Sequence, residues 1–280
     1  MASPGSPSST TTPQDDAIVR FRGVTKAFGS HVILDGIDLN VRAGQTTVVL
    51  GPSGAGKSVL LKHIAGLLRP DRGEVWFRDQ RVDRLSERKL TPIRRDIGFL
   101  FQMAALFDSM TVAENIEFPL VEHSTLSPLR RQVRVRQALQ RVDLEGVEGK
   151  FPGQLSGGQR KRVGLARAII LNPSLVLYDE PTTGLDPVRA DGINSLIIRL
   201  QKELGVTSIV VTHDLVSAER VADRVVVLHS GHILEDGTWD ELQRSSSQTV
   251  RSFLAGRDEA LDALDDAPAA AASTATEGTP

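Results

Sequence analysis

Three features of this sequence predict an α/β fold with a mainly parallel sheet, an N-terminal antiparallel β unit and an inserted helical subdomain. First, apolar β-branched runs alternate with helical patterns along the chain, which is typical of a parallel sheet with crossover helices. Second, short alternating segments over residues 18–41, interrupted by Gly29, Gly36 and Gly44, favour antiparallel strands. Third, strand signals vanish over residues 103–155, which indicates an insertion built from helices.

The first buried strand candidate ends in a glycine-rich segment with a defined chemistry. Residues 46–50 are apolar or β-branched, and the pattern G-x-x-x-x-G-K-S follows them. Such glycines let the backbone N–H groups converge on a phosphate, and the next helix adds its N-terminal dipole. We expect that helix to begin near Lys57, whose side chain would reach the β- and γ-phosphates while the Ser58 hydroxyl holds Mg²⁺. The predicted nucleotide-binding loop comprises Gly51, Pro52, Ser53, Gly54, Ala55, Gly56, Lys57 and Ser58.

A second anion site is predicted about a hundred residues further on. Residues 155–159 read Leu-Ser-Gly-Gly-Gln and open an apolar-periodic stretch, so Ser156 lies where a helix N-terminus should be. A Ser-Gly-Gly segment can simply be a loop or a helix cap. Both interpretations can hold together, because a capped helix start can also bind phosphate.

Two carboxylates end another short strand candidate, residues 175–180. Asp179 at such a strand end can contribute to a Mg²⁺ shell, and Glu180 can polarise an attacking water. The alternative is a strand followed by an acidic helix cap. Downstream of a phosphate-binding loop, the catalytic interpretation is favoured.

Two further strand candidates deliver polar residues in the same way. Gln102 follows residues 97–101, and His213 follows residues 208–212. Open α/β sheets bind ligands at the carboxyl ends of their strands, although a lone histidine is usually structural. We expect both side chains near the nucleotide.

Composition limits the class of protein. The net charge of −2 argues against a nucleic-acid binder that works by bulk electrostatics, and the absence of cysteine excludes disulfides and thiolate metal sites. No apolar run approaches the roughly twenty residues that a membrane helix needs. The Ser/Pro/Thr-rich start also carries no visible cleavable signal. A role at a membrane would therefore require docking on an embedded partner.

We expect one folded region, residues 16–256, between two disordered tails, residues 1–15 and 257–280. The helical subdomain within it is expected over about residues 103–165. Ser127 and Pro128 predict the start of a helix that runs to about Val142. Its arginines form either a solvated face or, less favoured, a contact with anionic lipid. They are Arg130, Arg131, Arg134, Arg136 and Arg141.

Taken in order, these motifs resemble the ATP-binding subunit of an ABC transporter over residues 18–241. The resemblance implies a P-loop NTPase (RecA-like) core that binds ATP and Mg²⁺. It assigns catalysis to Glu180, His213 and Gln102, and metal binding to Ser58, Gln102 and Asp179. Phe28 would stack on adenine, where the family commonly has tyrosine; phenylalanine keeps the π-face and loses only the hydroxyl.

The resemblance also implies a homodimer with two shared ATP sites. Ser156, Gly158 and Gln159 match the family signature, which contacts the γ-phosphate held by the opposite subunit. The segment 184–186 matches the D-loop, which places Asp186 near the shared interface. An integral membrane permease would be the further partner.

Two segments are similar to the Mla-type ATPases, which energise phospholipid transport with MCE proteins across the bacterial envelope. They are residues 105–123 and 250–256. This similarity implies a phospholipid cargo, an MCE-domain lipid-binding partner, a small cytoplasmic accessory subunit and a peripheral location on the cytoplasmic face of the inner membrane. The apolar residues of 103–110 would border the groove that receives the permease, although each could instead pack the subdomain core.

Two other functions stay open. The same ATPase could serve a small-solute importer, such as an amino-acid transporter, because only the membrane partner would differ. A non-transport ABC ATPase in DNA repair or translation is disfavoured, because the chain shows neither a long heptad insertion nor a second P-loop.

Overall fold

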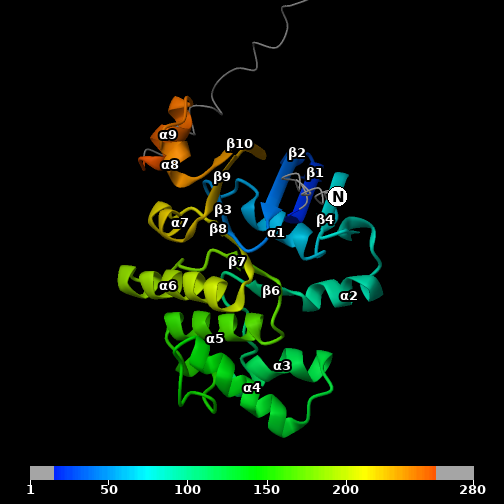
Figure 1. The fold of residues 1–280 in the computed structure, drawn as a ribbon, viewed down its shortest axis with the longest axis vertical. Helices are drawn as coiled ribbons and strands as arrows, with labels where there is room; N and C mark the ends of the chain where they lie inside the picture. Colours follow the sequence, from blue (N-terminus) through cyan, green and yellow to red (C-terminus); the bar gives the residue numbers. More distant parts are fainter. Residues whose placement is uncertain (1–15, 257–280) are drawn as a thin grey trace, which may run out of the picture.

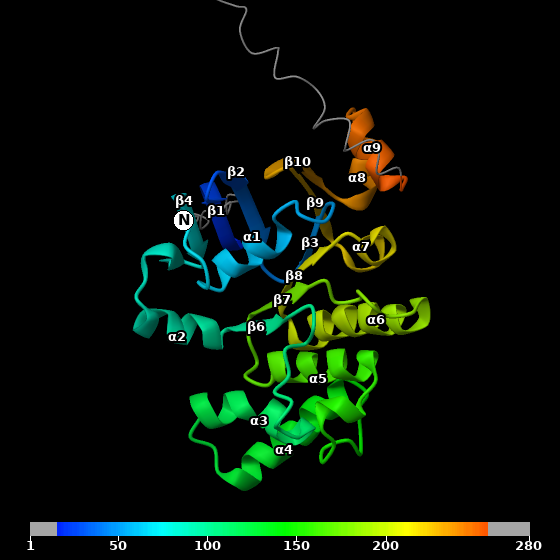
Figure 2. The ribbon, with the colours of Figure 1, turned by 180° about the vertical axis from the view of Figure 1, so that it is seen from behind.

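A computed structural model describes residues 16–256 of the chain (Figure 1). The two predicted tails, residues 1–15 and 257–280, lie outside the described residues. Both ribbon views place two sheets and their helices at one end and a helical subdomain at the other (Figure 2). Among the described residues, no helix is both long and apolar enough to cross a membrane.

The first described strands form an antiparallel sheet, as the alternating segments predict. Its strand order is β2-β1-β4-β5, and β1 pairs with both β2 and β4 in antiparallel register. Gly29 and Gly44 lie at strand ends, whereas Gly36 lies inside β2 with φ of 64° and does not interrupt it. The strands are β1 (Ala17–Phe28), β2 (His31–Arg42), β4 (Arg72–Phe77) and β5 (Gln80–Arg81).

The second sheet is mainly parallel and has the order β10-β9-β3-β8-β7-β6. Every residue of β3, β7 and β8 is buried, which is why these strands read as continuous apolar runs. Among the described strands of this sheet, only the edge strand β10 is antiparallel to its neighbour. The strands are β3 (Thr46–Leu50), β6 (Ile97–Leu100), β7 (Leu175–Asp179), β8 (Thr207–Thr212), β9 (Arg224–His229) and β10 (His232–Gly237).

Side chains that alternate along the parallel strands divide the hydrophobic core in two. Val49 of β3 packs with the antiparallel sheet and α1, whereas Val48 and Leu50 pack toward the helical subdomain. Helices cover both faces of the sheet, and short 3₁₀ turns lie at Val82–Arg84 and Pro152–Gln154. The helices outside the subdomain are α1 (Lys57–Ile64), α2 (Glu87–Arg95), α6 (Pro187–Leu204), α7 (Leu215–Val221), α8 (Trp239–Gln243) and α9 (Gln248–Leu254).

Helices α3 (Val112–His123), α4 (Pro128–Arg141) and α5 (Gly157–Ile169) pack together as the inserted subdomain. Helix α5 continues past residue 165, where we expected the subdomain to end. Ser127 precedes Pro128 at the start of α4 as predicted, although the Ser127 hydroxyl makes no capping hydrogen bond.

The basic helix α4 uses two of its arginines inside the subdomain. Arg131 pairs with Glu117 of α3 at 2.6 Å, and Arg134 donates to the Ile170 carbonyl at 2.8 Å. Arg130, Arg136 and Arg141 are exposed. The arginines of α4 therefore divide between structural contacts and a solvated face.

Candidate nucleotide-binding site

A cavity of about 410 Å³ lies where β3, β6, β7 and β8 end and α1 begins. Most of the residues predicted to bind nucleotide or to react with it meet here, although they come from distant parts of the chain. The cavity is lined by Phe28, Ile33, Ser53, Gly54, Gly56, Lys57, Ser58, Val59, Gln102, Glu180 and His213.

Two glycines of the loop are required by the close approach of neighbouring backbone. A Cβ at Gly51 would lie 2.1 Å from the Leu228 carbonyl oxygen, and one at Gly56 would lie 2.8 Å from the Ile33 carbonyl oxygen. Gly56 is also in the left-handed region, with φ of 98°, and forms the N-cap of α1. No side chain caps this helix start. The first backbone N–H groups of α1 therefore lie beside the cavity without a side-chain acceptor, an arrangement that suits a phosphate.

Lys57 is buried beneath the loop. Its Nζ donates to the carbonyls of Gly51 and Pro52, each at 2.8 Å, and lies 3.6 Å from Glu180 Oε1. Burial lowers the pKa of Lys57 from its ordinary 10.5, and the nearby Glu180 carboxylate opposes this shift. This ammonium group lies on the cavity wall, within reach of an anion placed there.

Ser58 and Asp179 present oxygen atoms at the side of the cavity. Ser58 Oγ donates to Asp179 Oδ1 at 2.7 Å, and burial raises the pKa of Asp179 although this hydrogen bond opposes the rise. A hydroxyl, a carboxylate and the Gln102 amide are ligands that suit Mg²⁺, which also keeps several waters and takes phosphate oxygens. The described residues contain no cluster of three or more His, Cys, Asp or Glu side chains that could hold a metal alone. The residues present therefore fit a Mg²⁺ ion that shares its coordination with a nucleotide.

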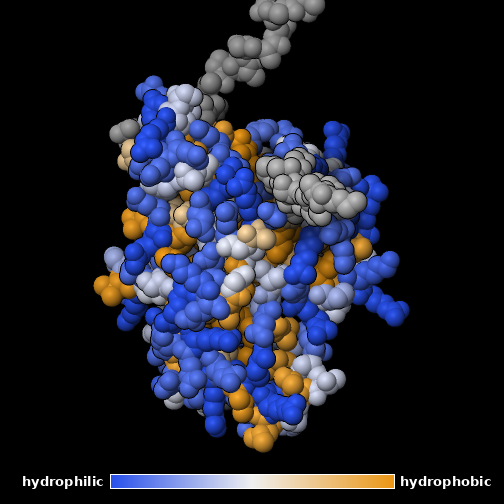
Figure 3. All heavy atoms as spheres, viewed as in Figure 1, coloured by the Kyte–Doolittle hydropathy of each residue, from blue (hydrophilic) through white to orange (hydrophobic). Residues whose placement is uncertain are grey.

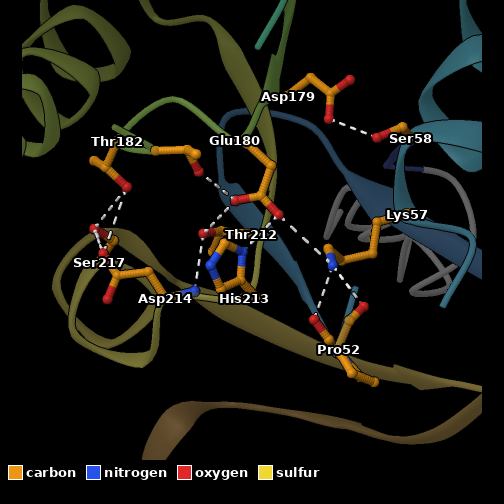
Figure 4. A network of polar contacts seen from close by, with 12 residues as sticks. Pro52, Lys57, Ser58, Asp179, Glu180, Thr182, Thr212, His213, Asp214 and Ser217 are labelled. Atoms are coloured by element: carbon orange, nitrogen blue, oxygen red, sulfur yellow. Dashed lines mark hydrogen bonds and ion pairs between the residues drawn. The ribbon is translucent and has the colours of Figure 1, made fainter. Parts of the chain in front are cut away.

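The carboxylate of Glu180 is held from several sides (Figure 4). Its Oε1 lies 3.0 Å from His213 Nδ1, while its Oε2 accepts from Thr183 Oγ1 at 3.1 Å and Thr212 Oγ1 at 3.3 Å. Glu180 is only 8% exposed, and its φ of 47° lies in the left-handed region that non-glycine residues seldom adopt. Such a conformation persists only where the surroundings hold it, as they do here. The arrangement can orient a water for attack on an electrophile in the cavity.

Sequence reasoning missed two of these partners and a third nearby residue. Thr183 and Thr212 carried no signal beyond their position next to predicted motifs. Lys161 is 6% exposed on the inner face of α5, and it donates to the backbone carbonyls of Gln102 and, at 3.0 Å, Glu180. Burial lowers its pKa, although Asp179 and Glu180 oppose the shift. A lysine four residues before the core residue Leu165 was a detectable signal, because that spacing places both on one helix face.

The signature residues lie outside this cavity, although the structure describes all of them. Ser156 caps α5 as predicted: its Oγ accepts from Gln159 N–H, and the Gln159 side chain accepts from Ser156 N–H. Asp186 caps α6 by accepting from Arg189 N–H at 3.0 Å. Within one chain, therefore, Ser156, Gly158, Gln159 and Asp186 are not brought to the loop at residues 51–58.

Phe28 stands at the mouth of the cavity with 48% of its surface exposed. Lys26 Nζ lies 5.4 Å from the centre of its ring. An exposed ring at the edge of a cavity that suits phosphate is well placed to stack on a planar base.

A groove with a volume of about 320 Å³ lies between α2, β6 and the helical subdomain. The rings of Phe107 and Phe118 meet on its wall with centroids 5.1 Å apart, and Ala105 lines it as well. Ala104 and Leu106 instead pack against the hydrophobic core. The apolar segment 103–110 is thus divided between the groove and the core, so neither interpretation applies to all of it. On the face seen in Figure 3, apolar residues gather over the helical subdomain on an otherwise largely hydrophilic surface.

Comparisons with known proteins agree with this geometry. The family model described as ABC transporter matches residues 34–183. The probable ribonucleotide transport ATP-binding protein mkl of Mycobacterium leprae is 43% identical over 85% of this chain and 69% of its own length. The intermembrane phospholipid transport system ATP-binding protein MlaF of Haemophilus influenzae is 40% identical over 86% of this chain and 92% of its own length. At 41% and 40% identity, the chain also matches ATP-binding proteins named for Fe(3+) ion import and methionine import.

A solved structure supports the fold. It is the dimeric post-hydrolysis state of the ATP-binding cassette MJ0796 bound to ADP and Pi, with a TM-score of 0.73 and 36% identity. The match covers 79% of this chain and 98% of the other. The predicted fold class, a P-loop NTPase core with an antiparallel β subdomain and an inserted helical subdomain, is confirmed.

Proposed function

The chain belongs to the ABC transporter family as an ATP-hydrolysing subunit, and on this premise we propose that it energises phospholipid transport between the membranes of a bacterial envelope. The similarity to MlaF along 92% of that protein carries the cargo assignment. The partners proposed are a membrane permease, an MCE-type lipid-binding protein and a small cytoplasmic accessory subunit. The subunit would lie peripherally on the cytoplasmic face of the inner membrane.

The cavity supports ATP as the substrate. The loop at residues 51–58 would surround the phosphates, Lys57 would exchange its carbonyl and Glu180 contacts for phosphate oxygens, and Phe28 would stack on adenine. Ser58, Asp179 and Gln102 would hold Mg²⁺, which when bound neutralises charge on the transferred phosphoryl group.

Glu180 is proposed as the group that polarises the attacking water. The observation that carries this role is the position of its carboxylate, 3.0 Å from His213 and 3.6 Å from Lys57 on the wall of one cavity. Once Lys57 has turned to phosphate, Glu180 would keep its contacts with Thr183 and Thr212 and be free to accept a proton. His213 and Gln102 would sense the γ-phosphate.

The site is proposed to be completed by a second copy of the chain. Ser156, Gly158 and Gln159 lie outside the cavity of their own chain, yet they form a helix start of the kind that binds anions. The dimeric structure of MJ0796 bound to ADP and Pi supports a sandwich in which these residues face the partner's γ-phosphate. Asp186 would lie near the shared interface.

The groove lined by Phe107 and Phe118 is the proposed docking site of the permease. Its aromatic wall suits helix-in-groove recognition, and it begins a few residues beyond Gln102, on the segment that leaves the nucleotide cavity. Phe107→Glu is the variant that would charge this wall, because Leu106 packs the core instead. It should uncouple the permease while the free subunit still binds ATP.

A small-solute importer is the second candidate, favoured by the relatives named for methionine and Fe(3+) import and for ribonucleotide transport. The two candidates share every residue of the hydrolytic site and differ only in the membrane partner. Identification of the proteins that co-purify from native membranes in mild detergent separates them. Co-purification of a permease with an MCE-domain protein would support the lipid cargo. Co-purification of a solute receptor would support the importer and reject the lipid cargo.

A further inference from the structure

The segment that joins the nucleotide cavity to the groove, residues 102–107, is fastened to helix α5 at two points. Near the start of the segment, Lys161 donates to the Gln102 carbonyl. Six residues further along α5, Arg167 donates to the Ala104 carbonyl at 2.8 Å and lies over the Phe107 ring, 5.9 Å from its centre. Both cations come from the helix that begins at the signature.

The packing between the two donors is unusually close. A Cβ at Gly164 would lie 2.9 Å from Leu100 Cδ1 and 3.1 Å from Ala104 Cβ, so a larger residue here would require the Leu100 side chain and Ala104 to shift. Ala104 is 1% exposed, and both Ala104 and Ala105 have positive φ, 60° and 45°. A left-handed pair of alanines costs conformational free energy, which the contacts with α5 must offset.

Lys161 also contacts the backbone at the end of β7. The same Nζ that binds the Gln102 carbonyl donates to the Glu180 carbonyl at 3.0 Å. One buried ammonium group therefore joins the ends of β6 and β7 to the signature helix. Such a group is costly to desolvate, so its burial demands that its acceptors stay in place.

We infer that Lys161 is a positioning residue that holds the left-handed backbone of Glu180 and the segment at Gln102 against α5. With Arg167 as its second fastening, the groove segment and the signature helix would move as one body. A displacement of the groove by the permease would then reach the backbone of Glu180 through a single side chain. This inference rests on the proposed catalytic role of Glu180 and deepens it.

Steady-state kinetics of the full-length protein provide the first test. Lys161→Met keeps the length of the side chain and removes its charge and its donors. We expect kcat to fall by about 10- to 100-fold through misplacement of Glu180. The KM for ATP should stay close to that of the wild type, because Lys161 does not line the cavity. Lys161→Arg restores charge and donors and should recover most of the kcat.

Two outcomes would overturn the assignment. A wild-type kcat for Lys161→Met would show that the two carbonyls need no donor. Equal losses in Lys161→Met and Lys161→Arg would show that packing, and not hydrogen bonding, is what matters. Lys202→Met on the exposed side of α6 is the matched control and should leave both constants unchanged. If Lys161→Met fails to fold, Lys161→Gln replaces it, because the shorter amide can donate to one of the two carbonyls at most. A reduced kcat for Lys161→Gln would support the inference, and a wild-type kcat would overturn it.

A distance measurement tests separately whether residues 102–107 and helix α5 move as one body. The chain has no cysteine, so spin labels at Met103→Cys and Gln132→Cys would report the segment against α4 without background. Met103 is 82% exposed, and Gln132 is exposed on a helix that packs on α5. A narrow distance distribution should broaden in both Lys161→Met and Arg167→Met, and unchanged distributions would overturn the two-point fastening.

Glu180→Gln measured in the same assay separates this inference from the proposed function. Full activity of Glu180→Gln would reject the catalytic role of Glu180, and the inference would fail with it. An inactive Glu180→Gln beside a fully active Lys161→Met would reject the inference alone.

Discussion

Two helix starts carry the sequence motifs that we propose to bind the phosphates of ATP, and their surroundings in the structure differ. Helix α1 begins beside the cavity at a left-handed glycine, Gly56, with no side-chain cap. Helix α5 begins outside the cavity, and Ser156 and Gln159 satisfy each other's backbone N–H groups in a closed capping box. The first helix start therefore has no side-chain acceptor within the chain, while the second has one for a single N–H group of its first turn, that of Gln159.

This difference indicates how a shared site can be built. The α1 end carries Lys57 and adjoins Glu180, so the groups of the proposed reaction lie on one side. The α5 start has its own side-chain cap, and we propose that it faces a nucleotide held by the other subunit. Folding of each chain and assembly of the shared site would then be separate events. Dimerisation would control the assembly of the site.

The largest expected effect tests whether Glu180, beside the start of α1, is the catalytic carboxylate. Glu180→Gln should retain ATP binding and lose about 10²- to 10⁴-fold in kcat, because an amide cannot accept the proton of the attacking water. Phosphate release and equilibrium binding of a fluorescent ATP analogue measure the two properties. Glu203→Gln, on the exposed surface of α6, is the matched control. A loss of only twofold in Glu180→Gln would remove Glu180 from the reaction.

A mixing experiment asks whether the two helix starts belong to one site across two subunits. Lys57→Ala and Ser156→Arg should each be nearly inactive alone. Mixed in equal amounts, they should recover about a quarter of wild-type activity, because half of the randomly formed dimers contain one intact site of two. The phosphate release rate, as a function of the mixing ratio, measures this recovery. No recovery in the mixture, or full activity of a monomeric Ser156→Arg protein, would contradict the shared site.

A smaller effect tests the closed cap of α5. Ser156→Ala should lower the free energy of unfolding by about 1 kcal/mol, because it removes the acceptor for Gln159 N–H. Ser127→Ala at the start of α4 is the matched control, since Ser127 makes no capping hydrogen bond, and its cost should stay within about 0.5 kcal/mol. Urea unfolding of both variants without nucleotide measures the difference. Equal costs would mean that the capping box does not stabilise α5.

The smallest effect concerns the carboxylate beside the α1 end and depends on pH. Burial raises the folded-state pKa of Asp179 above its ordinary 3.8, so the free energy of unfolding falls as pH rises from 3.8 through that higher value. Without nucleotide, Asp179→Asn should therefore be more stable than the wild type at pH 7. The gain should disappear as the pH falls toward 3.8. Thermal unfolding over this range checks the sign, with Asp108→Asn, an exposed position, as the control.

Local patterns predicted much of this structure because the relevant physics is local. A buried parallel strand requires an apolar run, and a phosphate loop requires glycines before a helix, so β3, α1 and the loop between them could be located from consecutive residues. The ends of β6, β7 and β8 were found in the same way. Their convergence on one cavity followed from the rule that parallel strands present their carboxyl ends at one edge of the sheet.

Contacts between distant elements could not be obtained in this way. The hydroxyl of Thr212 contacts Glu180 only because β7 and β8 are neighbours, and Lys161 reaches two carbonyls only because α5 crosses the ends of β6 and β7. The spacing from Leu165 places Lys161 on the core-facing side of α5, but no local pattern in the sequence marks Lys161 or Thr212 as a partner of Glu180.

The sequence by itself determined which chemistry this protein can perform, because loop glycines, Lys57 and the strand-end carboxylates are short-range requirements of phosphate and water activation. Tertiary structure alone decided how that chemistry is divided. It placed Lys57 and Glu180 3.6 Å apart on one wall of the cavity and left Ser156 outside that cavity. It also placed Phe107 on the wall of the groove while Leu106 packs against the core. The physical reason is that burial and partner choice depend on which elements pack together, and packing is a property of the whole chain.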